Sequence, residues 1–143
     1  ASTFVAEFIG SPKMNLLPGR LVSADAGQAR VEVAGQVLTA AVDARALPAG
    51  SAVQLGVRPE HMAVADSGEG AALPASLLHG ERLGDSSLLY VSVGAGLPTM
   101  TVKMDGSVSR AAGSALTLRL LPEALHLFDS AGQACVRTVD LPV

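Results

Sequence analysis

The side chains with the greatest chemical capacity are three histidines and one cysteine, and their spacing indicates no reaction centre. His61, His79 and His126 lie far apart, without the short ligand spacing of a zinc site, so we expect structural or surface roles for them. Cys135 has no local helix or basic partner that would clearly activate it, and we expect a buried structural thiol. The 13 acidic residues scatter along turns, where capping is commoner than acid–base catalysis.

Nucleotide-binding and hydrolase motifs are missing from the sequence. There is no GxxxxGKS or GxxxxGKT phosphate loop, no GxSxG and no HExxH. Without these motifs the sequence predicts no catalytic residue, no cofactor-binding residue and no metal ligand, and this chain is not expected to be an enzyme.

Composition and charge narrow the class of protein further. The chain has 143 residues, a net charge of −3, 3% aromatic residues and one tyrosine. A nucleic-acid groove needs clustered Lys and Arg and usually stacking aromatics, so we exclude nucleic-acid binding. The single cysteine fits a reducing, cytoplasmic compartment. No apolar stretch approaches the roughly 18 residues of a membrane helix, so any work at a membrane is expected to go through another protein.

The segment 3–15 predicts one short helix and its exit. Phe4, Phe8 and Ile9 recur at helical spacing, Gly10 suits the helix C-terminus, and Pro12 blocks continuation. We expect this apolar stripe to pack on the chain's own barrel rather than on another domain.

After this segment the pattern alternates with period two, which is typical of β-strands. Turn signals such as Pro48-Ala49-Gly50 and Asp105-Gly106 separate the alternating runs. Short strands at such regular spacing predict an all-β fold of barrel or sandwich type. The expected strands are GRLVS (19–23), ARVEVA (29–34), QVLTAAV (36–42), AVQLGVR (52–58), SSLLYVSV (86–93), TMTVKM (99–104) and ALTLRLL (115–121).

The β-rich part of the sequence repeats itself once. GSAVQLGVRPEHMAVADS (50–67) aligns without a gap with GSALTLRLLPEALHLFDS (113–130), with eight identical residues and a shared hydrophobic phase. Upstream, LPGRLV (17–22) corresponds to LPASLL (73–78). We infer two tandem β-rich copies of about sixty residues each.

One feature of the repeat is present in both copies. Pro59-Glu60 and Pro122-Glu123 occupy equivalent places, so we interpret them as a structural turn. Proline fixes its own backbone angle, and the carboxylate that follows is expected to accept backbone N–H groups in the turn. We expect Glu60→Ala and Glu123→Ala to lower the melting temperature.

Two basic residues are present in the first copy alone. Arg58 and His61 correspond to Leu121 and Ala124, so the fold does not require a base at either place. They are free to make a specific contact, in which Arg forks onto a partner's carboxylate and His makes the contact pH-sensitive. An ordinary surface placement is the alternative.

Three segments together resemble one family. FVAEFIGSPKMNLLPG (4–19), LGVRPEH (55–61) and HLFDSAGQAC (126–135) have the order and spacing of the C-terminal part of maltose- and glycerol-phosphate-type ABC importer ATPases, and they span nearly the whole chain. The resemblance implies a TOBE region of two tandem barrels similar to oligonucleotide/oligosaccharide-binding (OB) folds. It also implies a peripheral location on the cytoplasmic face of the membrane, with ATP and Mg held by an upstream nucleotide-binding domain.

The resemblance also implies partners for this region. In that family this region forms a homodimer with the same region of a second subunit. It also contacts the nucleotide-binding domain of its own chain, which in turn contacts the membrane subunits. It is also where cytoplasmic regulatory proteins control transport. The candidate residues for such a regulatory contact are Arg58, His61, His126 and Phe128.

On this interpretation the chain has three parts. Residues 1–16 are a junction helix and linker from a nucleotide-binding domain, residues 17–70 the first β repeat, and residues 71–143 the second. Residues 17–143 are expected to form one compact regulatory unit.

A small-ligand module is the alternative function. SPKMNLLPGRL (11–21) also resembles the start of small molybdate-binding domains, in which backbone N–H groups and a lysine hold an oxyanion. Ser11 and Lys13 are the candidate oxyanion ligands, and a sugar is the other ligand considered for a module of this type. Against this function, the second copy lacks the corresponding Lys and Asn.

Overall fold

The computed structural model describes residues 13–65, 72–106 and 111–139. Within these ranges the chain forms β-strands and two short 3-10 helices, which confirms the all-β expectation. The helix expected over 3–15 lies almost entirely outside the described residues. Its last residue, Asn15, begins the first strand.

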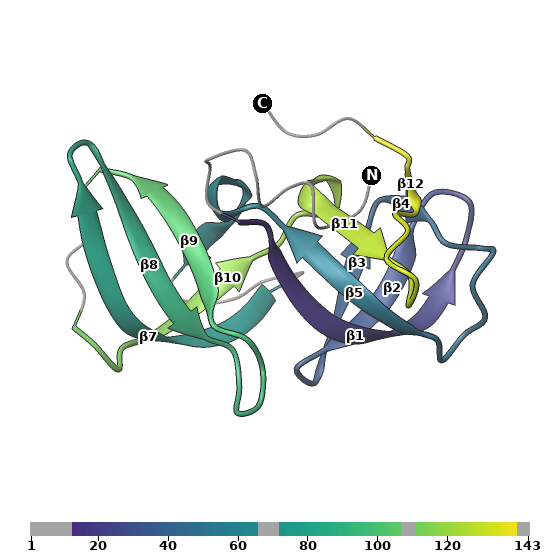
Figure 1. The fold of residues 1–143 in the computed structure, drawn as a ribbon, viewed down its shortest axis with the longest axis horizontal. Helices are drawn as coiled ribbons and strands as arrows, with labels where there is room; N and C mark the ends of the chain where they lie inside the picture. The colour runs from purple at the N-terminus through teal and green to yellow at the C-terminus, as the bar shows by residue number, and fades with distance from the viewer. Residues whose placement is uncertain (1–12, 66–71, 107–110, 140–143) are drawn as a thin grey trace.

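The first sheet is antiparallel and has five strands in the order β11-β5-β1-β2-β3. Figure 1 shows it beside a second curved sheet of similar size. The strands of the first sheet are β1 (Asn15–Ala24), β2 (Ala29–Val33), β3 (Gln36–Ala40), β5 (Ala52–Val57) and β11 (Leu125–Phe128).

The second sheet is also antiparallel, in the order β6-β10-β7-β8-β9. Both sheets carry a bulge at the same place, because the register shifts between Leu21 and Ser23 in β1 and between Leu77 and His79 in β7. The strands of the second sheet are β6 (Ala63–Ala65), β7 (Ala72–Leu83), β8 (Ser86–Ser92), β9 (Met100–Asp105) and β10 (Ala115–Arg119).

The two sheets exchange one strand each. β6 follows β5 in the sequence but pairs with β10 of the second sheet, with Val64 opposite Leu118. β11 follows β10 but pairs with β5 of the first sheet, with Leu127 opposite Leu55. The boundary between residues 70 and 71 stays a prediction, and across it each sheet receives one strand from the other repeat.

The two copies follow the same backbone course where their sequences agree best. Gly50 and Gly113 both have φ of +88°, a region that favours glycine. Their N–H groups donate to the carbonyls of Leu21 and Leu77, both at 2.7 Å. β5 and β10 then lead into equivalent 3-10 helices, and this correspondence supports the tandem repeat. The helices are η1 (Pro59–His61) and η2 (Pro122–Ala124).

The glutamates of the repeated turn do not hold it in place. In the described part of the chain no backbone N–H of either turn donates to the carboxylate of Glu60 or Glu123, so the hydrogen bonds expected of them are not formed. In each turn the N–H after the glutamate donates instead to the carbonyl before the proline, at 3.0 and 2.9 Å. Pro59 and Pro122 keep their expected place at the start of the turn. The lower melting temperature expected for the two glutamate variants therefore loses its structural basis.

Alternate strand residues build a core that is almost wholly aliphatic. Leu17, Leu55, Leu118, Leu125 and Leu127 are fully buried. Burying a leucine side chain stabilises the fold by about 1.5–3 kcal/mol, so the exchanged strand β11 contributes substantially to the first sheet.

Asn15 connects the two sheets. Its side-chain Nδ2 donates to the carbonyls of Val57 at 3.1 Å and of Thr101 at 2.8 Å. Its Oδ1 accepts the N–H of Thr101 at 2.8 Å. One amide side chain thus joins β1 and β5 of the first sheet to β9 of the second.

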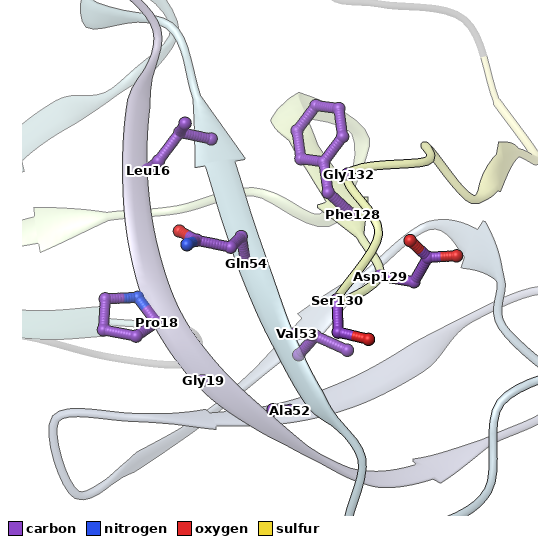
Figure 2. A pocket seen from close by; sticks show the side chains of 10 residues that line it. All are labelled: Leu16, Pro18, Gly19, Ala52, Val53, Gln54, Phe128, Asp129, Ser130 and Gly132. Carbon is purple, nitrogen blue, oxygen red and sulfur yellow. The ribbon is translucent and has the colours of Figure 1, made fainter. Parts of the chain in front are cut away.

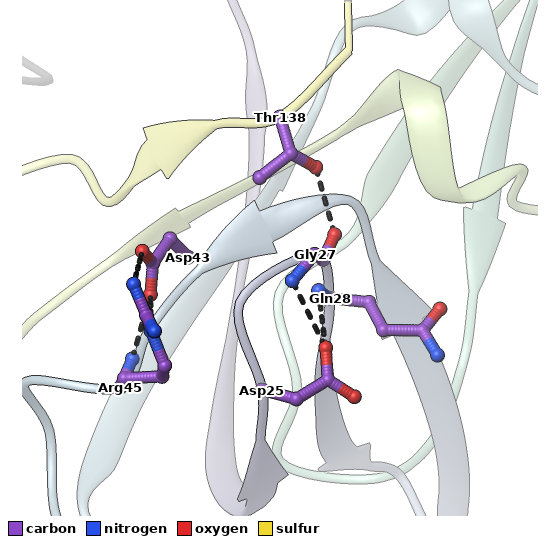
Figure 3. A network of polar contacts seen from close by, with 6 residues as sticks. All are labelled: Asp25, Gly27, Gln28, Asp43, Arg45 and Thr138. Carbon is purple, nitrogen blue, oxygen red and sulfur yellow. Dashed lines mark hydrogen bonds and ion pairs between the residues drawn. The ribbon is translucent and has the colours of Figure 1, made fainter.

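The last described residues form a separate two-stranded sheet with the residues that follow β3. β12 (Val136–Arg137) pairs with β4 (Val42–Asp43). The Thr138 hydroxyl donates to the Gly27 carbonyl at 2.7 Å (Figure 3). These contacts fix the position of Arg137 next to the start of β11.

Two local contacts lie close to these residues in the sequence, one in the turn between β1 and β2 and one at the end of β4. Asp25 Oδ1 accepts the N–H groups of Gly27 and Gln28, both at 3.0 Å (Figure 3). Asp43 and Arg45 form an exposed ion pair at 2.8 Å, and hydrogen bonds from Arg45 hold the pKa of the Asp43 carboxyl below its usual value. Both contacts lie in turns or at strand ends, and we assign them a structural role.

Candidate functional site

The site begins with a row of three residues that meet at Gly56. Gly56 of β5 pairs with Leu16 of β1 on one side and with His126 of β11 on the other. The neighbours of His126 in the sequence are fully buried, so His126 itself points away from the core. A Cβ atom at Gly56 would lie 2.7 Å from Met14 Sδ and 2.9 Å from Phe128 Cε2. Glycine therefore allows these two side chains to close over the strand.

A second row lies beside the first and lines a pocket of about 370 Å³. Gln54 of β5 pairs with Pro18 and Phe128. The turn after β11 forms the opposite side, where Asp129 Oδ1 accepts two backbone N–H groups of the turn, both at 2.9 Å. Figure 2 shows Gln54 and Pro18 on one side of the view and Asp129 and Ser130 on the other. The third family-like segment, 126–135, thus shapes one wall of this pocket.

Four basic side chains lie at the start of β11, and we call them the basic cluster: Arg58, His61, His126 and Arg137. Arg58 directly follows β5, and His61 ends η1. The guanidinium of Arg137 donates to one backbone carbonyl of η2 and one of β11. The ring of His126 stacks with Phe128, with centroids 6.4 Å apart, so the cluster and the pocket share a wall.

The environment of the cluster opposes further positive charge. Burial, with smaller contributions from the charges of Arg137, Arg58 and His61, lowers the pKa of His126 from 6.5 to about 4. His61 Nδ1 and His126 Nε2 are buried and have no hydrogen-bond partner. At neutral pH His126 is therefore uncharged.

Acidification is expected to destabilise the chain through His126. Its folded pKa of about 4 lies below the 6.5 of a free histidine, so between these values the unfolded state binds the proton more tightly. The free energy of unfolding should fall as the pH is lowered through this range. Urea unfolding at several pH values measures this, and His126→Ala should remove that part of the fall. The same pH dependence in His126→Ala as in the wild type would contradict the prediction.

The second sheet has an equivalent row with different side chains. Arg119 of β10 takes the place of Gly56, and it pairs with Ala72 and Ala63. Ala63 takes the place of His126. The two sheets keep the same pairing, but only the first sheet has the basic cluster, so the pairing does not depend on it.

The structure brings together the four residues predicted for a regulatory contact, Arg58, His61, His126 and Phe128, although their role stays a prediction. It does not unite the two oxyanion candidates in a described site. Lys13 is exposed, and Ser11 lies outside the described residues.

Sequence reasoning missed two members of the site. Arg137 has no counterpart in the aligned segments, and no motif around it indicated its place beside β11. Gly56 could have been found, because the gap-free alignment sets it opposite Arg119, and a change from glycine to a large side chain marks a difference in packing.

The described residues contain neither a metal-ligand group nor a membrane-spanning helix. Within 13–65, 72–106 and 111–139, no three His, Cys, Asp or Glu side chains are grouped so that they could hold a metal ion. In the same ranges no helix is long and apolar enough to cross a membrane.

The fold and the site define a class of protein. Two curved antiparallel sheets, each completed by a strand of the other repeat, are typical of a tandem OB-type module. Residues 10–62 match the MalK OB fold domain, and residues 55–128 match the TOBE domain. The chain belongs to the TOBE domain family, as the three segments indicated.

Curated relatives extend this match over almost the whole chain. The maltose/maltodextrin import ATP-binding protein MalK of Salmonella typhi is 33% identical over 138 residues, which are 96% of this chain and 37% of that protein. The MalK protein of Photorhabdus laumondii is 32% identical over 97% of this chain and 38% of that protein. The chain thus spans little more than a third of the length of these relatives.

A solved structure shares the fold. The cytoplasmic molybdate-binding protein ModG, in a form with molybdate bound, superposes with a TM-score of 0.67. The match covers 84% of this chain and 97% of that one, at 16% sequence identity. At this identity the likeness supports the fold alone.

Proposed function

We propose that this chain is the regulatory domain of the ATP-binding subunit of a carbohydrate-type ABC importer. The observation that carries the proposal is the 33% identity to MalK over 96% of the chain. In this function the chain performs no catalysis. ATP and Mg are bound by the nucleotide-binding domain of the complete subunit, which works with membrane subunits at the cytoplasmic face of the membrane.

The regulatory contact is assigned to the outer face of β11 and to the basic cluster beside it. This assignment is supported by the convergence of Arg58, His61 and His126 at one strand end of the first sheet, which the second sheet does not reproduce. The family resemblance adds a homodimer of regulatory domains and a cytoplasmic regulatory protein as the partners of this region. An oxyanion or sugar module of the TOBE type receives support from the fold of ModG alone.

The proposal is tested in the complete subunit assembled with its membrane subunits in proteoliposomes. Arg58→Leu introduces at position 58 the leucine that the second repeat carries at position 121, so folding should be preserved. We expect the ratio of solute-stimulated to basal ATP hydrolysis to change by about fivefold or more, because a lost charged hydrogen bond is worth at least about 1 kcal/mol.

The matched control removes one positive charge from the other sheet. Arg119 is exposed on β10, and Arg119→Leu should leave the ratio as in the wild type. Equal ratios in the wild type and in Arg58→Leu, with both proteins folded, would count against a regulatory contact at this face.

A further inference from the structure

Three members of the basic cluster, Arg58, His61 and His126, have no acidic counterpart among the described residues. Arg58 is half-buried, and neither it nor the two histidines forms an ion pair with a carboxylate in the described part of the chain. The charged groups that act on His126 are Arg137 from β12, Arg58 from the end of β5 and His61 from η1, and all are basic. The glutamates of η1 and η2 form no ion pair with Arg58 or with either histidine.

Two imidazole nitrogens in the cluster also lack partners. His61 Nδ1 and His126 Nε2 are both buried without a hydrogen bond. Most buried polar atoms in folded proteins are hydrogen-bonded, so each such atom needs an explanation. A neutral imidazole can donate a hydrogen bond from one of its two nitrogens. His61 Nδ1 and His126 Nε2 can therefore each act as a donor, and both belong to the basic cluster.

The second sheet shows that this arrangement is not required by the fold. Leu121, Ala124 and Ala63 stand at the second sheet where the first sheet has Arg58, His61 and His126. The equivalent strands nevertheless pair in the same register in both sheets. An arginine without an ion pair and two imidazole nitrogens without hydrogen bonds, at places where the fold accepts apolar residues, are best explained by an anionic ligand.

We propose that the basic cluster binds an oxyanion, a carboxylate or phosphate group, with Arg58 as the charged fork and the His61 and His126 nitrogens as hydrogen-bond donors. The planar guanidinium of arginine matches the oxygens of both groups. The inference rests on the proposed function for the source of the anion, which is an acidic or phosphorylated side chain of the regulatory partner. An inorganic oxyanion has the same chemistry and is the simplest probe.

The experiment follows the His126 ring by NMR in the 143-residue chain during a pH titration. Sulfate serves as the tetrahedral dianion, because its charge is constant over the range, and chloride at equal ionic strength is the reference. Because a bound anion stabilises the imidazolium, sulfate should raise the pKa of His126 by about one unit or more. Arg58→Leu should abolish the rise, and Arg119→Leu, which removes one positive charge from the second sheet, should retain it.

A second arm distinguishes the two sources of the anion. Formate and a short glutamate peptide, both still ionised at about pH 5, are compared with sulfate. A response to formate and to the peptide assigns the site to a carboxylate, and a response to sulfate alone assigns it to a phosphate-like group. No rise in the His126 pKa with any of these anions overturns the proposal, as does an equal rise in Arg58→Leu. Either result leaves the ATP hydrolysis test of the proposed function unaffected, because that test does not depend on anion binding.

Discussion

A chain divided between its repeats is expected to give two halves that fold only together. The half 1–68 carries β1 to β6 but lacks β11, and the half 69–143 carries β7 to β12 but lacks β6. Each half would have an incomplete sheet and two strands without their partners, β4 and β6 in the first half and β11 and β12 in the second. The first half would also lose Leu125 and Leu127, each worth about 1.5–3 kcal/mol of burial. A loss of this size is a large share of the 5–15 kcal/mol that holds an ordinary domain together.

Circular dichroism and amide NMR of each half, alone and mixed in equal amounts, check this expectation. Each half alone should show no cooperative unfolding, and the mixture should recover the spectrum of the intact chain. As a control, four Gly/Ser residues inserted between residues 68 and 69 should change the stability by less than about 1 kcal/mol, since loop closure depends weakly on length. Native-like cooperative unfolding of either isolated half would show that the exchanged strands are dispensable.

The strand exchange is the part of the fold that could not be predicted from the sequence. Six of the seven expected strands form as single strands, because their alternation reports directly which residues face a core. The seventh, 36–42, is divided between β3 and β4, which belong to different sheets. The repeat likewise fixed the local course of each copy, including Gly50 and Gly113. A short strand such as β6 or β11 carries too few residues to specify which sheet edge it joins. That choice depends on the packing of the whole domain.

The long strand β7 was not among the expected strands, although the repeat set its first half, LPASLL (73–78), opposite LPGRLV (17–22). Residues 78–83 are exposed, so they lack the buried alternation that identifies a strand, and their pairing with β8 holds them in the sheet.

The candidate site could also be predicted only in part. Contrast between the copies identified Arg58 and His61, whereas Arg137 reaches the cluster only because β12 is attached to β4.

Replacing Asn15 is expected to have the largest effect of any single polar substitution in the described residues. Asn15 is 8% exposed and makes three hydrogen bonds with backbone groups of β5 and β9. Asn15→Ala leaves buried backbone groups without a partner, and we expect the free energy of unfolding to fall by about 3 kcal/mol. For a domain of this size that corresponds to about 10 °C in melting temperature. Gln36→Ala, which removes an exposed amide, should change stability by less than about 0.5 kcal/mol.

A local measurement shows whether the effect of Asn15 arises from the link between the sheets. The N–H of Thr101 donates to Asn15 Oδ1, so in Asn15→Ala this amide should exchange with solvent much faster, while amides of β2 and β3 change only with the overall stability. Asn15→Asp retains the acceptor but sets a carboxylate against the carbonyls of Val57 and Thr101. It should therefore be destabilised at neutral pH and partly recover in acid, where the protonated group can donate. If Thr101 stays protected in Asn15→Ala and the melting temperature hardly changes, the side chain does not hold the two sheets together, and their contact must depend on apolar packing alone.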